Sequence, residues 1–189
     1  MSMMRVARVA LLLLPLAACT GMEPFVADTA TIPAGAMGGG LDPDMAALNH
    51  AQWAFADSSR TYGKPIEAAR AALAMDYLAG QLNSSPRWGS VSALTKQQLL
   101  EGRAEVRAAL GVAPGATSQQ VVDGLAGASV ALAAGDQALA VRALSTPVFP
   151  AGGLAVLAAL ADMPYLRMAN VSTMRAANEL FDSGTDERL

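Results

Sequence analysis

Cys19 is the residue whose chemistry is easiest to name, because it is the only cysteine in this chain of 189 residues. It follows a short basic region with Arg5 and Arg8, an apolar run over residues 9–14, and Leu-Ala-Ala at residues 16–18. A basic start, a short apolar core and small residues before a cleavage point are typical of a secretory signal peptide. A membrane-spanning helix would need about 20 apolar residues. The sequence therefore predicts export, with a leader that ends before the cysteine.

The segment Leu16-Ala17-Ala18-Cys19 closely resembles the lipobox of bacterial lipoproteins. The resemblance implies that residues 1–18 are removed, that Cys19 is thioether-linked to diacylglycerol, and that its new amine is acylated, for example with palmitate. Two or more acyl chains hold a protein firmly on a membrane. In this family an aspartate after the cysteine retains the protein in the inner membrane, so Thr20 favours the periplasmic face of the outer membrane. An ordinary secretory leader that is cut elsewhere is the alternative.

Two pairs of residues are of types that often occur at binding sites, but each pair also has a simple structural explanation. His50 and Trp53 lie three residues apart, with Asp57 one turn further. They form either a polar patch with an aromatic platform, or a surface histidine beside a tryptophan that packs on a neighbouring helix. Arg87 and Trp88 share a predicted loop. Both residue types are enriched at binding hot spots, which suggests recognition, but a loop tryptophan also folds back over a core.

A third candidate is a basic edge on a predicted helix over residues 94–110. At 100° per residue, Lys96, Arg103 and Arg107 fall within one narrow sector at the edge of the apolar stripe. Glu101 and Glu105 lie on the far side, a face that we expect to be solvated. Such an edge would bind an acidic partner or anionic lipid headgroups. The alternative is a solvated edge whose charge is offset by acids elsewhere in the fold.

Motifs of the common catalytic and cofactor sites are not found in the sequence. It has no glycine-rich phosphate loop, no Gly-x-Ser-x-Gly, no His-Glu-x-x-His and no Cys-x-x-Cys-His. With one histidine and one cysteine, we expect no catalytic residues, no metal site and no cofactor. Loss of the leader leaves 11 basic and 16 acidic residues, so binding to nucleic acid is not expected.

The elements that must position these residues are predicted to be helices. Alanine and leucine dominate, aromatic residues make up 5% of the chain, and β-branched runs are scarce. Asp42 with Pro43, Pro65, and Thr117 with Gln120 are typical of helix starts. The sequence predicts an all-α domain over residues 42–182, with six or seven antiparallel helices in a bundle or a short helical-hairpin array. Their expected ranges are 42–59, 65–83, 94–110, 118–134, 136–144, 154–161 and 162–181.

The segments on either side of this domain have a different composition. Residues 19–41 contain the cysteine that we expect to be lipidated, then two prolines and Gly38-Gly39-Gly40, with no helical or strand period. They predict a flexible tether with a root-mean-square reach of roughly 25 Å. Residues 183–189 predict a frayed polar tail.

One turn inside the domain is similar to a known repeat. Leu132-Ala133-Ala134-Gly135-Asp136, followed by Ala140 and Leu144, is similar to the inter-helix turn of a tetratricopeptide repeat. The similarity covers about half of one repeat, and the chain shows no recurrence at 34 residues.

These observations predict a lipid-anchored, periplasm-facing helical module that docks another envelope protein or assembly. Its expected partners are the membrane, through Cys19, and an envelope protein. The alternative is a carrier of a small apolar ligand or acyl chain, suggested by the almost entirely apolar segment 154–161, which we expect in the centre of the core. An envelope hydrolase that uses His50 or Asp57 is the least favoured function. The sequence leaves the oligomeric state open.

Overall fold

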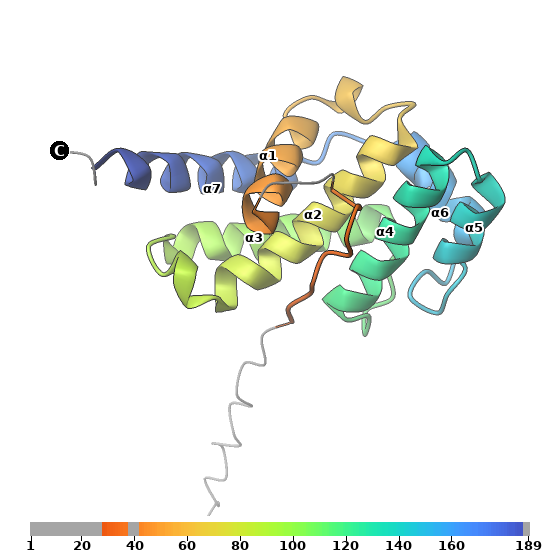
Figure 1. Ribbon diagram of the computed structural model, residues 1–189, viewed down its shortest axis with the longest axis horizontal. Coiled ribbons are helices and arrows are strands. Elements are labelled where there is room, and N and C mark those ends of the chain that lie inside the picture. Colours follow the sequence, from red (N-terminus) through yellow and green to blue (C-terminus); the bar gives the residue numbers. More distant parts are fainter. Residues whose placement is uncertain (1–27, 38–41, 187–189) are drawn as a thin grey trace, which may run out of the picture.

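The computed structural model describes residues 28–37 and 42–186, so Cys19 and the rest of the leader lie outside the described residues. Within these two ranges the chain is entirely helical, with seven α-helices, two short 3₁₀ helices and no strand (Figure 1). The prediction of an all-α fold is confirmed. The helices are α1 (Pro43–Phe55), η1 (Ser58–Arg60), α2 (Pro65–Ser84), η2 (Pro86–Trp88), α3 (Ala93–Ala109), α4 (Ser118–Ala133), α5 (Gln137–Leu144), α6 (Gly153–Ala161) and α7 (Arg167–Asp186).

The starts of the helices follow the local signals in the sequence. The Asp42 carboxylate accepts hydrogen bonds from backbone amides in the first turn of α1, and Pro43 is the first residue of that helix. Pro65 begins α2 in the same way. Thr117 and Gln120 form a complete capping box at the start of α4, in which each side chain accepts a hydrogen bond from the other's backbone amide.

Helix α2 forms the centre of the fold. Every residue from Ala71 to Gly80 is buried, and the helix packs against α1, α3, α4 and α6. Figure 1 shows α2 running through the middle of the molecule, with these helices around it. Five of these ten side chains are alanine or glycine, whose small size allows neighbouring helices to approach closely.

Helices α3 and α7 lie antiparallel, and each one caps the start of the other. Glu105 near the end of α3 accepts hydrogen bonds from the backbone amides of Met168 (2.8 Å) and Ala169 (3.0 Å) at the start of α7. Glu179 of α7 accepts from the backbone amide (2.8 Å) and the hydroxyl (2.9 Å) of Ser92, which precedes α3. Glu105 is therefore a helix cap and does not belong to a solvated face.

Two features of the C-terminal region differ from the sequence prediction. Helix α6 is not in the centre of the core, because it buries one face, with Val156 and Leu160, and leaves Leu154 68% exposed. Helix α7 begins at Arg167, later than expected, and continues to Asp186. Part of the expected polar tail therefore belongs to this helix, which continues through Gly184.

Residues 28–37, which we call the strap, run across α2 and α4 (Figure 1). Ala36 is fully buried and Ile32 packs against the core. The Thr31 backbone amide donates to the Gln119 side chain (2.7 Å), and that side chain donates back to the Thr31 carbonyl (3.1 Å). These residues therefore belong to the folded body and not to the flexible tether that the sequence predicts there.

Candidate functional site

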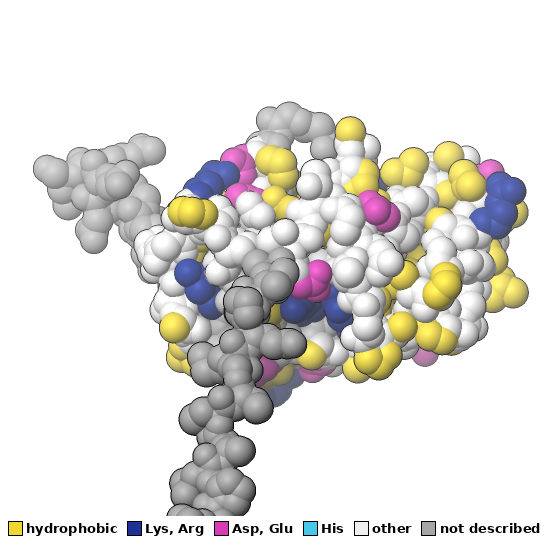
Figure 2. All heavy atoms as spheres, turned by 90° about the horizontal axis from the view of Figure 1, so that it is seen from below, with side chains coloured by type: hydrophobic (Ala, Val, Ile, Leu, Met, Phe, Trp, Pro, Cys, Tyr) yellow, Lys and Arg dark blue, Asp and Glu magenta, His cyan; other side chains and the backbone are white. Residues whose placement is uncertain are grey.

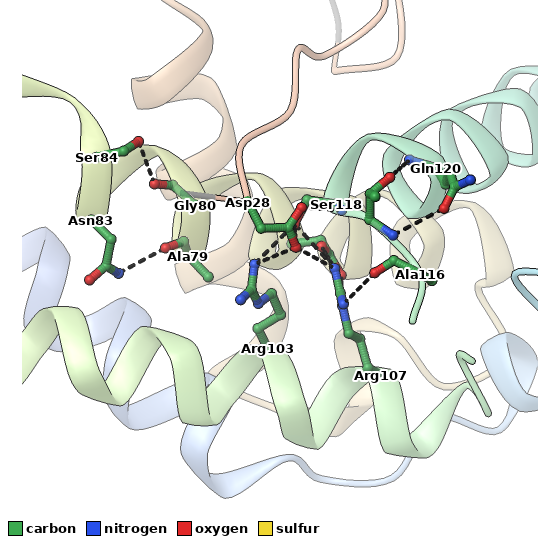
Figure 3. Close-up of polar contacts among 12 residues, drawn as sticks. Asp28, Ala79, Gly80, Asn83, Ser84, Arg103, Arg107, Ala116, Ser118 and Gln120 are labelled. Atoms are coloured by element: carbon green, nitrogen blue, oxygen red, sulfur yellow. Dashed lines mark hydrogen bonds and ion pairs between the residues drawn. The ribbon is translucent and has the colours of Figure 1, made fainter. Parts of the chain in front are cut away.

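Asp28 of the strap lies among polar side chains from three helices (Figure 3). Its Oδ1 accepts a hydrogen bond from the Ser118 backbone amide at 2.7 Å. Its Oδ2 accepts from the Ser118 hydroxyl at 2.9 Å and lies 3.3 Å from Nη1 of Arg103 and 3.4 Å from Nη2 of Arg107. Four donors thus converge on one carboxylate. The group of side chains that we call the Asp28 cluster consists of Asp28, Asp76, Arg103, Arg107 and Ser118.

The two arginines reach this position because they are four residues apart on α3, so they lie on one face of the helix. Figure 3 shows both side chains rising from α3 towards Asp28. Nε and Nη2 of Arg107 bind the two carboxylate oxygens of Asp76 on α2, at 2.8 Å and 2.6 Å. Asp76 itself is 1% exposed. The charge of the basic edge is thus offset by acids of the same chain but, contrary to the expectation from the sequence, the edge is not solvated, since the side chains of Arg103 and Arg107 are 18% and 17% exposed.

The two arginines differ in how well their charges are compensated. Burial opposes the charge of Arg107, but the hydrogen bonds and charges of Asp76 and Asp28 outweigh it and raise the pKa of Arg107. Burial and the nearby charge of Arg107 lower the pKa of Arg103, and the attraction of the two acids is too weak to reverse this. Arg103 is therefore the cation of the cluster that gains most from an additional anion.

An open hollow of about 730 Å³ lies beside Asp28. Arg103 and Arg107 line it, together with Thr29, residues 114–117 and Gln119. Figure 2 shows acidic and basic side chains next to each other near the middle of the face that it presents. A molecule in solution can therefore approach the two arginines from outside while the strap is in place.

Gly80 of α2 is the reason that the strap can pass so close to the helix. A Cβ at this position would overlap the backbone carbonyl oxygen of Asp28 and would lie 3.1 Å from the Thr29 Cα. Both contacts are with backbone atoms, which cannot move aside without moving the strap. Gly80 therefore fixes the path by which Asp28 reaches the arginines.

The second candidate pair, Arg87 and Trp88, belongs to an internal polar network. Trp88 is 8% exposed, and its Nε1 donates to Oδ2 of the buried Asp44 at 2.9 Å. The Arg87 guanidinium lies 4.3 Å from the centroid of the Trp88 ring and also contacts Asp42 (2.5 Å) and Asp44 (3.1 Å). Trp88 thus folds back over the core, with Arg87 covering it from the solvent side.

Tyr77 completes this network, because its hydroxyl donates to Oδ1 of Asp44. Burial, and then the hydrogen bond and charge of Asp44, raise the pKa of Tyr77. Slight burial opposes ionisation of Asp42, but the hydrogen bond from Arg87 and those from the start of α1 lower its pKa. Asp44 of α1 is therefore the acceptor for three side chains, one from α2 and two from η2, and the network joins these three elements.

The other candidate pair, His50 and Trp53, is split between the core and the surface. The rings of His50 and Trp53 are 5.6 Å apart and tilted by 46°. Trp53 is 43% exposed, with the Arg60 guanidinium 5.5 Å from its ring centroid. His50 is mostly buried, and its Nε2 lies 3.3 Å from the Glu67 carbonyl oxygen. Burial lowers the pKa of His50. Asp57 caps η1 through the Ser59 amide.

Lys96 does not join the Asp28 cluster, although it shares a helix sector with Arg103 and Arg107. It has no ion pair among those found within residues 28–37 and 42–186, and it is half-buried. Within the same residues no group of three His, Cys, Asp or Glu side chains is arranged to hold a metal ion. None of the helices in the described part is both long enough and apolar enough to cross a membrane.

No protein-family model, curated protein or solved structure matches this chain.

The structure adds residues that the sequence did not identify. Asp28, Asp44, Asp76 and Ser118 carry the two polar networks, and none of them was a candidate for binding. Asp76 had a detectable signal, because it is the only charged residue in the buried run over residues 71–80. Asp28 had no such signal, because its neighbours in a proline- and glycine-rich segment do not show whether its carboxylate is solvated or paired.

Proposed function

We propose that this chain is a bacterial lipoprotein, anchored through Cys19, whose helical body docks another protein of the cell envelope. Support for the anchor comes from the leader and the lipobox-like segment. The strap adds a geometric argument, because Asp28 follows Cys19 by only nine residues. Nine extended residues span at most about 32 Å. While the strap is bound, a lipidated Cys19 would keep the Asp28 side of the body within that distance of the membrane surface.

The observation that best supports docking is an apolar groove beside the strap. It has a volume of about 370 Å³ and lies between the strap and helices α4 and α5. Val130 and Leu139 line it and are 49% and 44% exposed. Figure 2 shows further apolar side chains over the end of the molecule that α4, α5 and α6 form. Exposed apolar side chains around a groove are typical of surfaces that bind other proteins.

The chemistry of the groove suggests what kind of partner it binds. Its lining is apolar except for Asp123, an exposed acid on α4. An amphipathic helix fits such a groove by inserting its apolar face. A lysine or arginine beside that face would pair with Asp123. We therefore propose that the partner presents an amphipathic helix with a basic residue at its edge.

Two experiments test the two halves of this proposal. For the anchor, cells that express the chain or its Cys19→Ala variant are grown with labelled palmitate, and only the former is expected to carry the label. For docking, a photo-crosslinking amino acid is placed at position 130 or, as a control, at the exposed position 97 of α3. A discrete adduct at position 130 alone, joined to a basic amphipathic helix, supports the proposal.

Other outcomes would contradict it. Equal palmitate labelling of both chains removes the anchor. Adducts of equal yield at both positions, or adducts only with a second copy of this chain, remove the docking function. A lipid found bound by native mass spectrometry, with no protein adduct at position 130, would favour a carrier of acyl chains instead, since the groove is apolar.

A further inference from the structure

The geometry around Asp28 matches that of a bound anion more than that of an ordinary ion pair. Both carboxylate oxygens accept hydrogen bonds, and the donors are a helix-start amide, a hydroxyl and two guanidinium groups. Such a mixed set of donors is typical of sites that bind carboxylate or phosphate groups of ligands. In this structure the group that fills the site belongs to the chain itself.

The donors are held by the body and do not depend on the strap. Arg107 is fixed by its two hydrogen bonds to Asp76 and by a third to the Ala116 carbonyl oxygen (3.0 Å). Ser118 is the first residue of α4, and the capping box on Thr117 fixes that end of the helix. Removal of Asp28 would therefore leave the donors in place, with two arginines and one acid. The site would then carry one net positive charge.

The strap, in contrast, is a single pass of chain on the surface of the body. Ala36 is fully buried and Ala30, Ile32 and Met37 are partly buried against the core, whereas five of its ten residues are exposed. Apart from those of Asp28, its hydrogen bonds to the other described residues are the two between Thr31 and Gln119. Surface segments of this kind open at a lower free energy than the core. The open hollow beside Asp28 gives a competing anion access before the strap has left.

We propose that the Asp28 cluster is a ligand site occupied by the chain's own carboxylate, and that Arg103, Arg107 and Ser118 bind the carboxylate or phosphodiester group of an external ligand when the strap lifts. Both groups carry one negative charge and present two oxygens from one atom, as Asp28 does. One negative charge from either group neutralises the net positive charge that the site carries without Asp28. The inference does not depend on lipidation of Cys19 or on the groove between α4 and α5.

Exchange of the two anions links ligand binding to the strap. An external anion binds only the fraction of molecules whose strap is open, so its apparent affinity is reduced by that fraction. By the same linkage, a bound ligand keeps the strap detached. Deletion of the Asp28 carboxylate should therefore increase the affinity for external anions.

The test uses the full chain in a non-ionic detergent, with acetate as the carboxylate probe and dimethyl phosphate as the phosphodiester probe. We expect Asp28→Ala to bind at least one probe ten or more times more tightly than the unmodified chain, as measured by titration calorimetry. Adding Arg103→Gln to Asp28→Ala should abolish the gain. Binding of acetate alone assigns a carboxylate ligand, and binding of dimethyl phosphate assigns a phosphodiester such as a lipid headgroup.

A second variant covers the case in which Asp28→Ala does not fold. Gln119→Ala removes the two hydrogen bonds to Thr31 but keeps Asp28 and the arginines, so its affinity for the probes should lie above that of the unmodified chain. In this variant a saturating probe should speed hydrogen exchange of the strap amides over residues 29–37. If neither variant binds either probe more tightly, or if Arg103→Gln leaves the gain intact, the proposed site is wrong.

Discussion

Arg107 and Asp76 form a buried ion pair with two parallel hydrogen bonds that connects α3 to the central helix α2. Asp76 is 1% exposed and the Arg107 side chain 17%. Loss of one partner from such a pair leaves an uncompensated charge in the interior, which typically costs about 3–5 kcal/mol. Asp76→Ala should therefore lower the free energy of unfolding by about 3 kcal/mol, measured by chemical denaturation. Arg107 keeps part of its hydration and the hydrogen bond to Ala116, which places the value at the low end of that range.

Glu101→Ala is the control, since Glu101 lies on the exposed side of α3 and, within the described residues, its side chain accepts a hydrogen bond only from Gln97. It should change the unfolding free energy by less than about 0.5 kcal/mol. If Asp76→Ala lowered the free energy of unfolding by less than about 1 kcal/mol, water would be able to solvate Arg107 in place of Asp76, and the prediction would be wrong.

Gly80→Ala should detach the strap without destabilising α2. Alanine favours a helix interior by up to about 1 kcal/mol over glycine. Its Cβ, however, would overlap the Asp28 carbonyl oxygen. We expect the variant to be cleaved within residues 28–37 faster than the unmodified chain, as measured by limited proteolysis and mass spectrometry. Its helical content, measured by circular dichroism, should be unchanged. Gly115→Ala is the control, because a Cβ there meets nothing within 4 Å. Equal cleavage of both variants would contradict the packing of the strap on Gly80.

Asp44→Ala should expose Trp88 to water. The substitution leaves the Trp88 indole and the Tyr77 hydroxyl without their acceptor, and each unsatisfied buried donor costs about 1–3 kcal/mol. Emission from Trp88 should shift to longer wavelength, measured in a Trp53→Phe background because the chain has two tryptophans. Asp42→Asn keeps an oxygen that can cap α1 but removes the exposed charge paired with Arg87, and it should leave the spectrum unchanged. Identical spectra for the two variants would argue against the network.

Glu179 should contribute stability that depends on pH. Partial burial opposes its ionisation, but hydrogen bonds from Thr95 and Ser92 outweigh this and lower its pKa from the usual 4.5. A group whose pKa is lower in the folded state stabilises the fold at high pH, and this contribution is lost as the pH falls below about 4.5. Glu179→Gln should cost about 1 kcal/mol at pH 7, as for other helix caps.

The same variant should also show a shallower loss of stability below about pH 4.5 than the unmodified chain. Denaturant unfolding at several pH values measures both effects. Glu101→Gln serves as the control and should keep the original pH profile. A parallel profile for Glu179→Gln would show that the carboxylate of Glu179 is not the group that titrates.

Local chemistry in the sequence was sufficient to predict the helices, but not the contacts between distant segments. Pro65 and the Thr117–Gln120 box act on residues within one turn, so their effect is readable from a short stretch. The contact of Asp28 with Ser118 spans 90 residues, and no pattern near either residue indicates it. The strap therefore could not be distinguished from a solvated tether.

The candidate site shows the same division between local and distant information. The sequence correctly placed Arg103 and Arg107 on one face, because helical spacing alone determines this. It could not identify the acids that pair with them, since these come from α2 and from the strap. Glu105 shows the opposite error, as its solvated position was inferred from the face of an isolated helix, whereas α7 begins directly against it.

The position of α2 also has a consequence for how the chain acquires its structure. The helix is complete at Ser84, yet its neighbours α3, α4 and α6 are supplied by the next 77 residues, up to Ala161. Until those residues have been added, the buried run over residues 71–80 has too few surfaces to cover it, and exposed apolar segments associate with one another. Nearly the whole domain must therefore be synthesised before α2 is covered. A chain truncated before α6 should collect in inclusion bodies, even though its remaining helices have all their own capping signals.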